Sequence, residues 1–331
     1  MILLFLILFG NDHAWEITNT GVFSRVLPVH VAVSPGGDLY LADVHEHRII
    51  HYDHSGNRLP DLGGKGQGPG EFNVRLLALQ HDDRFLYAFA LMDRDINVYD
   101  GEGSFLKTIR TPYTWTNPLR TASKLTEGWL VFHQGQLLHM TDDFQLVFLL
   151  AEEKKSHKRG SQTSRPFNPA RDMPRFTVNR ERNKVLFCTP GQGFKIKAYD
   201  VSKGTVTTLF TLDSPKFPFI ESWGLEKLEA RTKRRSVLTQ DGWFRDFPEY
   251  FPDIIDLKLD FEGYLHITRG VALVDPTAQK PVLSQNGQPV DDHIPSDRLM
   301  SILADDGKWI YVASYPNDEL KIHKVKHKAF R

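Results

Sequence analysis

The chain has 331 residues, of which 40% are hydrophobic, and it contains 22 Phe, 10 Tyr and 6 Trp. This composition supports a sizeable core and excludes disorder as the state of the whole chain. Lys plus Arg equals Asp plus Glu, at 41 each, so bulk charge excludes general recruitment of nucleic acid or of an anionic membrane. The single cysteine, Cys188, lies in an apolar run and is interpreted as a small buried hydrophobe.

The N-terminal segment predicts export. Residues Ile2–Phe9 form an uninterrupted apolar run that is too short to span a bilayer but has the length of a signal-peptide core. No Lys or Arg precedes this run, so an uncleaved anchor and a buried first strand remain alternatives. We expect residues 1–14 to be a signal peptide or N-terminal anchor. The protein is then secreted, periplasmic or in the cell envelope, with membrane contact only through an uncleaved N-terminal segment.

Six copies of one pattern follow, from about Val29 to Val325. Each copy has an apolar strand, a turn, a second strand rich in Leu, Tyr and Val, and a third strand that ends close to an Asp. The clearest copy is HVAVSPGGDLYLADVHEHRIIHYDHSG, from His30 to Gly56. Successive second strands are 47, 44, 55, 79 and 46 residues apart, counted between Tyr40, Tyr87, Val131, Leu186, Leu265 and Tyr311. A period of roughly 40–50 residues is typical of propeller blades, and the two long intervals require insertions.

The third strand of most copies is followed by an Asp, usually with Gly a few residues later. The residues are Asp53, Asp100, Asp142, Asp200 and Asp275. Asp can accept a hydrogen bond from its own downstream backbone, and Gly supplies positive φ, so the pattern indicates a hairpin turn. We therefore interpret these carboxylates as structural and not as a catalytic set.

A glycine-rich segment, Gly63–Phe72 with the sequence GGKGQGPGEF, connects the first copy to the next. A strand, a YxxD-type turn and then GxGxGPGxF resembles the NHL repeat, especially that of the bacterial six-bladed β-propeller family. This resemblance implies an all-β fold of six four-stranded blades. The glycine run lacks the GK[ST] end of a phosphate loop, and no GxGxxG opens a helix here, which argues against phosphate binding.

The last copy supplies only three strands, near Leu299–Ala304, Trp309–Ser314 and Leu320–Lys326. The N-terminal WEITNTG alternates apolar and polar residues, so we expect a strand near Glu16–Thr20 to pair with Leu320–Lys326 and close the ring. The prediction is one propeller domain over residues 15–331, acting as a monomer.

Both long intervals fall in connections between blades, about 152–174 after blade 3 and about 213–250 after blade 4. The first is basic, with candidate binding residues Lys154, Lys155, Lys158 and Arg159. The second begins with a predicted short helix and continues with the candidate binding residues Trp243, Phe244, Phe247 and Tyr250. We expect a protein, glycan or small molecule to bind on the blade 3–5 face that these insertions share. A solvated loop and simple packing against the blades are the alternatives.

Alignment of the inner strands places His30, Arg175 and Asp256 at one level near the channel mouth, and these are further candidate binding residues. Lactonase propellers need several carboxylate or amide ligands here, and the amidating-lyase relatives of NHL repeats use several His. One His and one Asp beside an Arg do not match either set. We expect no catalytic residue, no metal site and no cofactor, with a divalent cation in the channel as the alternative. The sequence ADVHEHR also suggests a metal site, but His45 and His47 occupy a variable loop, so we do not expect one there.

The residues therefore favour a non-enzymatic ligand- or protein-binding propeller of the cell envelope or extracellular space. The first alternative is a lactonase- or lyase-like enzyme that uses the channel mouth and a divalent cation. The second is an RNA-binding NHL propeller. The export signal and the zero net charge count against it, and we expect no nucleic-acid partner.

Overall fold

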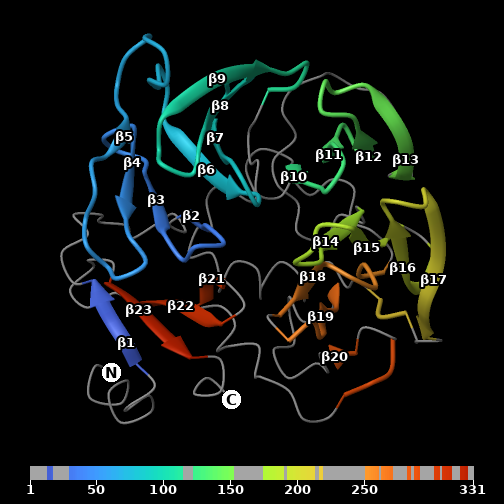
Figure 1. Cartoon of the computed structure of the whole chain (residues 1–331). Coiled ribbons are helices and arrows are strands. Elements are labelled where there is room, and N and C mark those ends of the chain that lie inside the picture. The colour runs from blue at the N-terminus through green and yellow to red at the C-terminus, as the bar shows by residue number, and fades with distance from the viewer. Residues whose placement is uncertain are drawn as a thin grey trace, which may run out of the picture. The chain divides into compact units, whose positions relative to one another are not determined.

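The computed structural model describes residues 13–17, 30–114, 122–152, 174–189, 192–212, 216–218, 250–260, 262–270, 282–284, 287–290, 302–305, 308–314 and 321–326. In these residues the regular structure is almost entirely β, with 23 strands in six small antiparallel sheets (Figure 1). The fold class is an all-β, six-bladed β-propeller, as the repeat spacing predicts. Within the described part of the chain, no helix has the length and apolar character needed to cross a membrane.

The residues divide into two compact units. The first comprises Met1–Lys124, Asp142–Gln145 and His293–Arg331, and the second comprises Leu125–Thr141 and Leu146–Asp292. Each unit contains blades with an apolar core between them, and residues 122–124 form the only strand that falls in a different unit from the rest of its sheet among the described residues. Each unit is described by itself.

Blades 1 and 2 belong to the first unit. Blade 1 consists of β2 (Val31–Val33), β3 (Leu39–Asp43), β4 (Arg48–Tyr52) and β5 (Leu62–Gly63). Blade 2 consists of β6 (Leu76–His81), β7 (Leu86–Ala90), β8 (Asp95–Tyr99) and β9 (Phe105–Arg110). The second strands β3 and β7 are buried along their whole length, because both faces of each blade are covered.

Strand β3 shows how one blade serves two cores. Tyr40 and Ala42 pack into a cluster with residues of blade 2, whereas Leu39 and Leu41 pack with Tyr311 of blade 6. Successive residues of a strand point to opposite faces, so a blade between two neighbours needs apolar residues at every position of its central strand. This explains the continuous Leu, Tyr and Val character of the second strand in each copy.

Blade 6 also belongs to the first unit, and its outer strand comes from the N-terminus. It contains β21 (Ile302–Asp305), β22 (Trp309–Ser314), β23 (Lys321–Lys326) and β1 (His13–Ile17). Strand β1 is antiparallel to β23, with Glu16 opposite His323 and Ile17 opposite Ile322. It begins three residues before the strand that the sequence predicts, Glu16–Thr20. The closure of the whole ring stays a prediction.

Blade 3 consists of β10 (Ala122–Lys124), β11 (Trp129–His133), β12 (Gln136–Met140) and β13 (Leu146–Glu152). Blade 4 consists of β14 (Arg175–Val178), β15 (Lys184–Cys188), β16 (Phe194–Asp200) and β17 (Thr205–Leu212). Blade 5 has three strands among the described residues, β18 (Asp256–Leu259), β19 (Leu265–Thr268) and β20 (Val282–Leu283). The predicted helix of the second insertion lies outside the described residues.

The Asp residues after the third strands have the predicted structural role at three positions. The carboxylate of Asp53 accepts hydrogen bonds from the backbone N–H groups of Ser55 and Asn57, both at 2.8 Å. Asp100 and Asp200 cap their turns in the same way. Asp142 differs, because one of its oxygens lies 2.9 Å from the Lys124 ammonium nitrogen. Asp275 lies outside the described residues.

Candidate binding site

His30 lies directly before β2, at the start of the inner strand of blade 1. Its carbonyl accepts a hydrogen bond from the N–H of Ala42 at 2.9 Å, and the side chain is only 7% exposed. Burial lowers the pKa of His30 from 6.5 to about 4, and its Nδ1 has no hydrogen-bond partner among the described residues. The imidazole is therefore neutral near pH 7, and it is a poor proton donor there.

Arg175 and Asp256 begin the inner strands β14 and β18, as the alignment predicts. The Oγ1 of Thr177 accepts a hydrogen bond from the N–H of Leu259 at 3.4 Å, so this face of β14 is turned toward blade 5. Arg175 shares that face, because it is two residues away. Leu257 packs into the core shared with blade 4, so strand alternation places Asp256 on the other face of blade 5. The predicted placement of His30, Arg175 and Asp256 at one level of the channel mouth stays a hypothesis.

The two ends of the second insertion meet in the second unit. Pro218 and Tyr250 form an antiparallel bridge, and the N–H of Phe251 donates to the carbonyl of Phe217 at 2.9 Å. The described residues on either side of 219–249 are therefore adjacent in the structure.

Cations and aromatic rings gather where the insertion begins and ends. We call this group the insertion base and define it as Lys216, Phe217, Tyr250, Asp253 and Arg269. The ammonium nitrogen of Lys216 lies 5.4 Å from the ring centroid of Tyr250, and the guanidinium carbon of Arg269 lies 4.9 Å from that of Phe217. Both distances are within the range of a cation–π interaction.

Asp253 adds a carboxylate to the insertion base. Burial raises its pKa above the usual value of 3.8, and the nearby Lys216 and Arg269 act in the opposite direction. Tyr250 is 37% exposed, so part of this residue lies at the surface. The base thus combines two cations, two aromatic rings and one carboxylate, with Tyr250 partly at the surface.

Most predicted residues of the two insertions lie outside the described residues. These are Lys154, Lys155, Lys158, Arg159, Trp243, Phe244 and Phe247. Of the second set, only Tyr250 is described. Sequence reasoning missed Lys216, Asp253 and Arg269. The signal for Lys216 was available, since KFPF places a cation directly before two aromatic residues at the point where the repeat period breaks.

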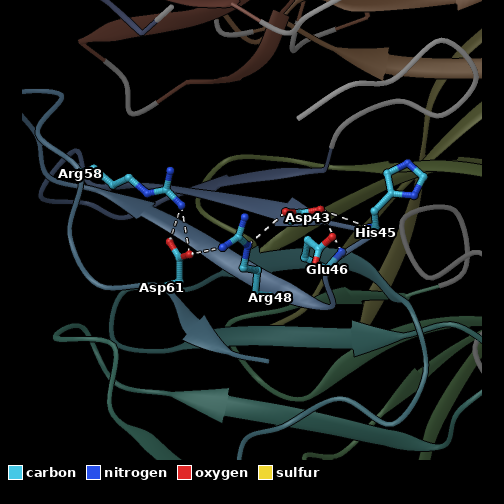
Figure 2. Close-up of polar contacts among 6 residues, drawn as sticks. All are labelled: Asp43, His45, Glu46, Arg48, Arg58 and Asp61. Atoms are coloured by element: carbon cyan, nitrogen blue, oxygen red, sulfur yellow. Dashed lines mark hydrogen bonds and ion pairs between the residues drawn. The ribbon is translucent and has the colours of Figure 1, made fainter. Parts of the chain in front are cut away.

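A second polar group lies at the turn between β3 and β4 (Figure 2). It consists of Asp43, His45, Glu46, Arg48, Arg58 and Asp61. The Asp43 carboxylate accepts from two backbone N–H groups of the turn and lies 3.1 Å from the Nε of Arg48. Arg48 and Arg58 both contact Asp61, at 2.9 and 3.0 Å. Two carboxylates thus balance two guanidinium groups, and the network holds the turn in shape.

This network also tests the metal interpretation of ADVHEHR. The Asp43 carboxylate already holds the turn, and the Nδ1 of His47 lies 3.3 Å from the carbonyl oxygen of Phe72. No group of three or more His, Cys, Asp or Glu side chains among the described residues could hold a metal ion. The Asp43 carboxylate and the His47 imidazole are thus both engaged within the fold.

The glycine-rich connection after β5 is folded back on itself. The N–H of Gly66 donates to the carbonyl of Phe72 at 3.3 Å, and the N–H of Phe72 donates to that of Gly64 at 2.8 Å. The N–H of Gly68 donates to the Glu71 carboxylate at 2.7 Å. In an anion-binding loop, backbone N–H groups of this kind donate to phosphate. Here the N–H of Gly68 donates to the Glu71 carboxylate instead.

The six sheets and the apolar cores between their blades define an all-β protein of the six-bladed β-propeller class. No protein-family model matches the chain, and no curated protein matches it. A candidate exported protein of Bacteroides fragilis matches with a TM-score of 0.51 and 11% identity, over 94% of this chain and 92% of that chain. Virginiamycin B lyase from Staphylococcus aureus matches with a TM-score of 0.42 and 16% identity, over 94% and 98%. Similarity at these identities concerns the fold alone.

Proposed function

We propose that this protein is a non-enzymatic recognition propeller that binds its ligand on the face that carries the second insertion. The observation that supports the proposal is the insertion base, where Lys216 and Arg269 lie beside aromatic rings and Tyr250 is partly exposed. Binding sites combine apolar or aromatic surface with a few polar groups that fix orientation, and this group has that composition.

The chemistry of the insertion base favours an anionic glycan as the ligand. Sugar rings pack on aromatic faces, and carboxylate or sulfate groups pair with Lys and Arg. The basic residues Lys154, Lys155, Lys158 and Arg159 of the first insertion would add positive charge on the same face. Asp253 supplies one acceptor for a sugar hydroxyl.

The observations favour binding over catalysis. A lactonase- or lyase-like reaction needs several metal ligands or a base in reach of the substrate. His30 is buried, with a pKa of about 4, and strand alternation directs Asp256 away from blade 4. The polar group of Figure 2 is engaged in holding its turn.

We also propose that the protein is exported, on the basis of the apolar run Ile2–Phe9. The similarity in fold to a candidate exported protein agrees with this proposal. Assignment to the NHL-repeat type is likewise a proposal, supported by GxGxGPGxF and the six repeats. Cell fractionation tests export, and recovery of the intact chain with Met1 from the cytosol would contradict it.

An array of anionic and neutral glycans tests the binding proposal. The purified chain should bind a subset of the anionic glycans, and Lys216→Ser with Tyr250→Ala should weaken this binding at least about tenfold, the equivalent of about 1.4 kcal/mol. Lys203→Ser is the matched control, because Lys203 is 73% exposed on a turn of blade 4. Equal binding by all three proteins, or no binding to any anionic glycan, would contradict the proposal.

A further inference from the structure

Strand β13 presents an unusual surface at the outer edge of blade 3. It is the terminal strand in the sheet order β10-β11-β12-β13, so its outer edge has no strand partner within the described residues. Four consecutive side chains are exposed, Leu146 at 60%, Val147 at 50%, Phe148 at 38% and Leu149 at 42%. We call these four residues the β13 strip.

The outer strands of the neighbouring blades differ from β13. In β9 the exposed Leu106 is followed by the exposed polar residues Lys107 and Thr108, and in β17 the exposed Val206 lies among threonines. Polar and charged residues on an edge strand prevent it from pairing with other chains. A run of four exposed apolar residues on such an edge promotes association, and in a native protein it marks an interaction site.

The strip is held rigidly by blade 4. The ring of Phe148 stacks on that of Tyr199, with centroids 5.5 Å apart and an interplanar angle of 15°. The hydroxyl of Tyr199 lies 2.7 Å from Nδ1 of His139, whose Nε2 lies 2.8 Å from the carbonyl oxygen of Glu127. One tautomer satisfies both contacts, with Nε2–H donating to the carbonyl and Nδ1 accepting from the hydroxyl. The stacked contact orients Phe148 before a partner binds, which lowers the ordering cost of binding at this side chain.

The pairing of β12 with β13 limits how a partner can bind. Leu137 and Leu138 lie opposite Ala151 and Leu149, so Leu150 is an extra residue, and the ladder shifts again at Val147. Such bulges twist a strand and interrupt its ladder. A partner would therefore use a short stretch of backbone together with the exposed apolar side chains.

We propose that the β13 strip docks an extended segment of a partner protein, apolar at its centre and basic at its ends, as an added strand. In the sequence, Asp142 and Asp143 precede the strip, and Glu152 and Glu153 follow it. Pairing of an extended peptide with an exposed sheet edge is a common recognition mode, with affinity from backbone bonds and specificity from side chains. The acidic flanks select basic ends in the partner.

The same charges disfavour a second copy of this chain as the occupant. If two copies paired antiparallel through the strip, with Leu146 opposite Leu149, then Asp143 of one copy would face Glu152 of the other. Like charges directly opposite in a ladder are destabilising. The proposal does not depend on the glycan binding proposed above, which involves other residues.

Selection from a displayed library of random nine-residue peptides tests the proposal with the full mature chain. The peptides recovered should alternate apolar residues at the centre and carry Lys or Arg at the ends. The triple variant Leu146→Thr, Val147→Thr and Leu149→Thr should bind the selected peptides at least about tenfold more weakly, since three apolar contacts are lost. Threonine keeps a high preference for strands, so the blade should fold. Leu106→Thr and Val206→Thr are the matched controls on other outer strands, and both should bind like the wild type.

A charge variant and two side measurements complete the test. Asp143→Lys should weaken binding of the basic peptides. Asp143 is chosen over Glu152 and Glu153, because those two carboxylates are followed directly by basic residues from Lys154. Failure to enrich any peptide, or equal binding by the triple variant, would overturn the proposal. Self-association in sedimentation that the triple variant loses would assign the strip to a second copy. Loss of binding to phosphatidylserine vesicles in the same variant would assign it to a membrane.

Discussion

Two connections between blades have the same topological position and opposite properties. The connection after β5 is short and rich in glycine, and its N–H groups and the Glu71 carboxylate are bonded within the loop. The connection after β17 contains the second insertion, and the insertion base carries cations, an exposed Tyr250 and a half-buried Asp253. A connection whose polar groups bond to one another, like that after β5, stabilises the fold. A connection that places charged and aromatic side chains at the surface, like that after β17, can contact a ligand.

The largest expected change in stability comes from replacing Gly63, the first residue of the glycine-rich connection Gly63–Phe72. This residue has φ of +72°, and a Cβ there would lie 2.5 Å from the Phe72 ring and 2.9 Å from the carbonyl oxygen of Gly70. Gly63→Ala should lower the free energy of unfolding by about 2–4 kcal/mol, because overpacking adds to backbone strain. Gly193 also has φ of +72° but has nothing within 4 Å of its Cβ position. Gly193→Ala should therefore cost only about 1 kcal/mol, and equal costs in urea unfolding would contradict the packing argument.

Acid should act with opposite sign on the buried histidines of blade 1, which precede the glycine-rich connection, and on the insertion base. Burial lowers the folded-state pKa of His30 to about 4 and also lowers that of His51, so neutral imidazoles favour folding above pH 6.5. This stability is lost as the pH falls from 6.5 toward the folded pKa, and His30 alone should cost on the order of 2 kcal/mol at pH 5. His30→Phe should flatten the loss in urea unfolding measured between pH 7 and 5.

The Asp253 carboxyl at the insertion base gives the opposite result. Its folded-state pKa is raised by burial, so the cost of its charge is present at neutral pH and is relieved as the pH falls through the folded pKa. Asp253→Asn should therefore remove a gain in stability that accompanies falling pH, whereas His30→Phe should remove a loss. The same direction for both variants would show that one of the two assignments is wrong.

Removal of aromatic residues from the second insertion, after β17, should weaken ligand binding and leave the stability of the protein nearly unchanged. Trp243→Ala with Phe247→Ala should weaken glycan capture about tenfold, equivalent to about 1.4 kcal/mol, and change the free energy of unfolding by less than about 0.5 kcal/mol. Leu106→Ala serves as the control, because Leu106 is exposed on another blade. Unchanged capture by the folded double variant, checked by circular dichroism, would place the site elsewhere.

The smallest effect should come from the basic run of the first insertion. Replacement of Lys154, Lys155, Lys158 and Arg159 by Ser should reduce binding only a few-fold, and mainly at low salt, because exposed charges are screened at physiological ionic strength. Binding measured at several salt concentrations should show a flatter dependence than the wild type. An unchanged salt dependence would remove this run from the proposed binding face.

The sequence by itself determined the number of blades and the chemistry of their turns. Both are local: the second strand of each copy carries its own apolar run, and Asp53 and Asp100 cap turns within four residues of themselves. The strand starts at Arg175 and Asp256 followed from the same repeat. Only the tertiary structure determined how the ends of the insertion meet through Phe217 and Phe251, and that the β13 strip is exposed. The meeting of the insertion ends and the exposure of the β13 strip both depend on contacts between segments that are distant in the sequence. An apolar run such as Leu146–Leu149 has the same sequence signature whether a neighbour covers it or not.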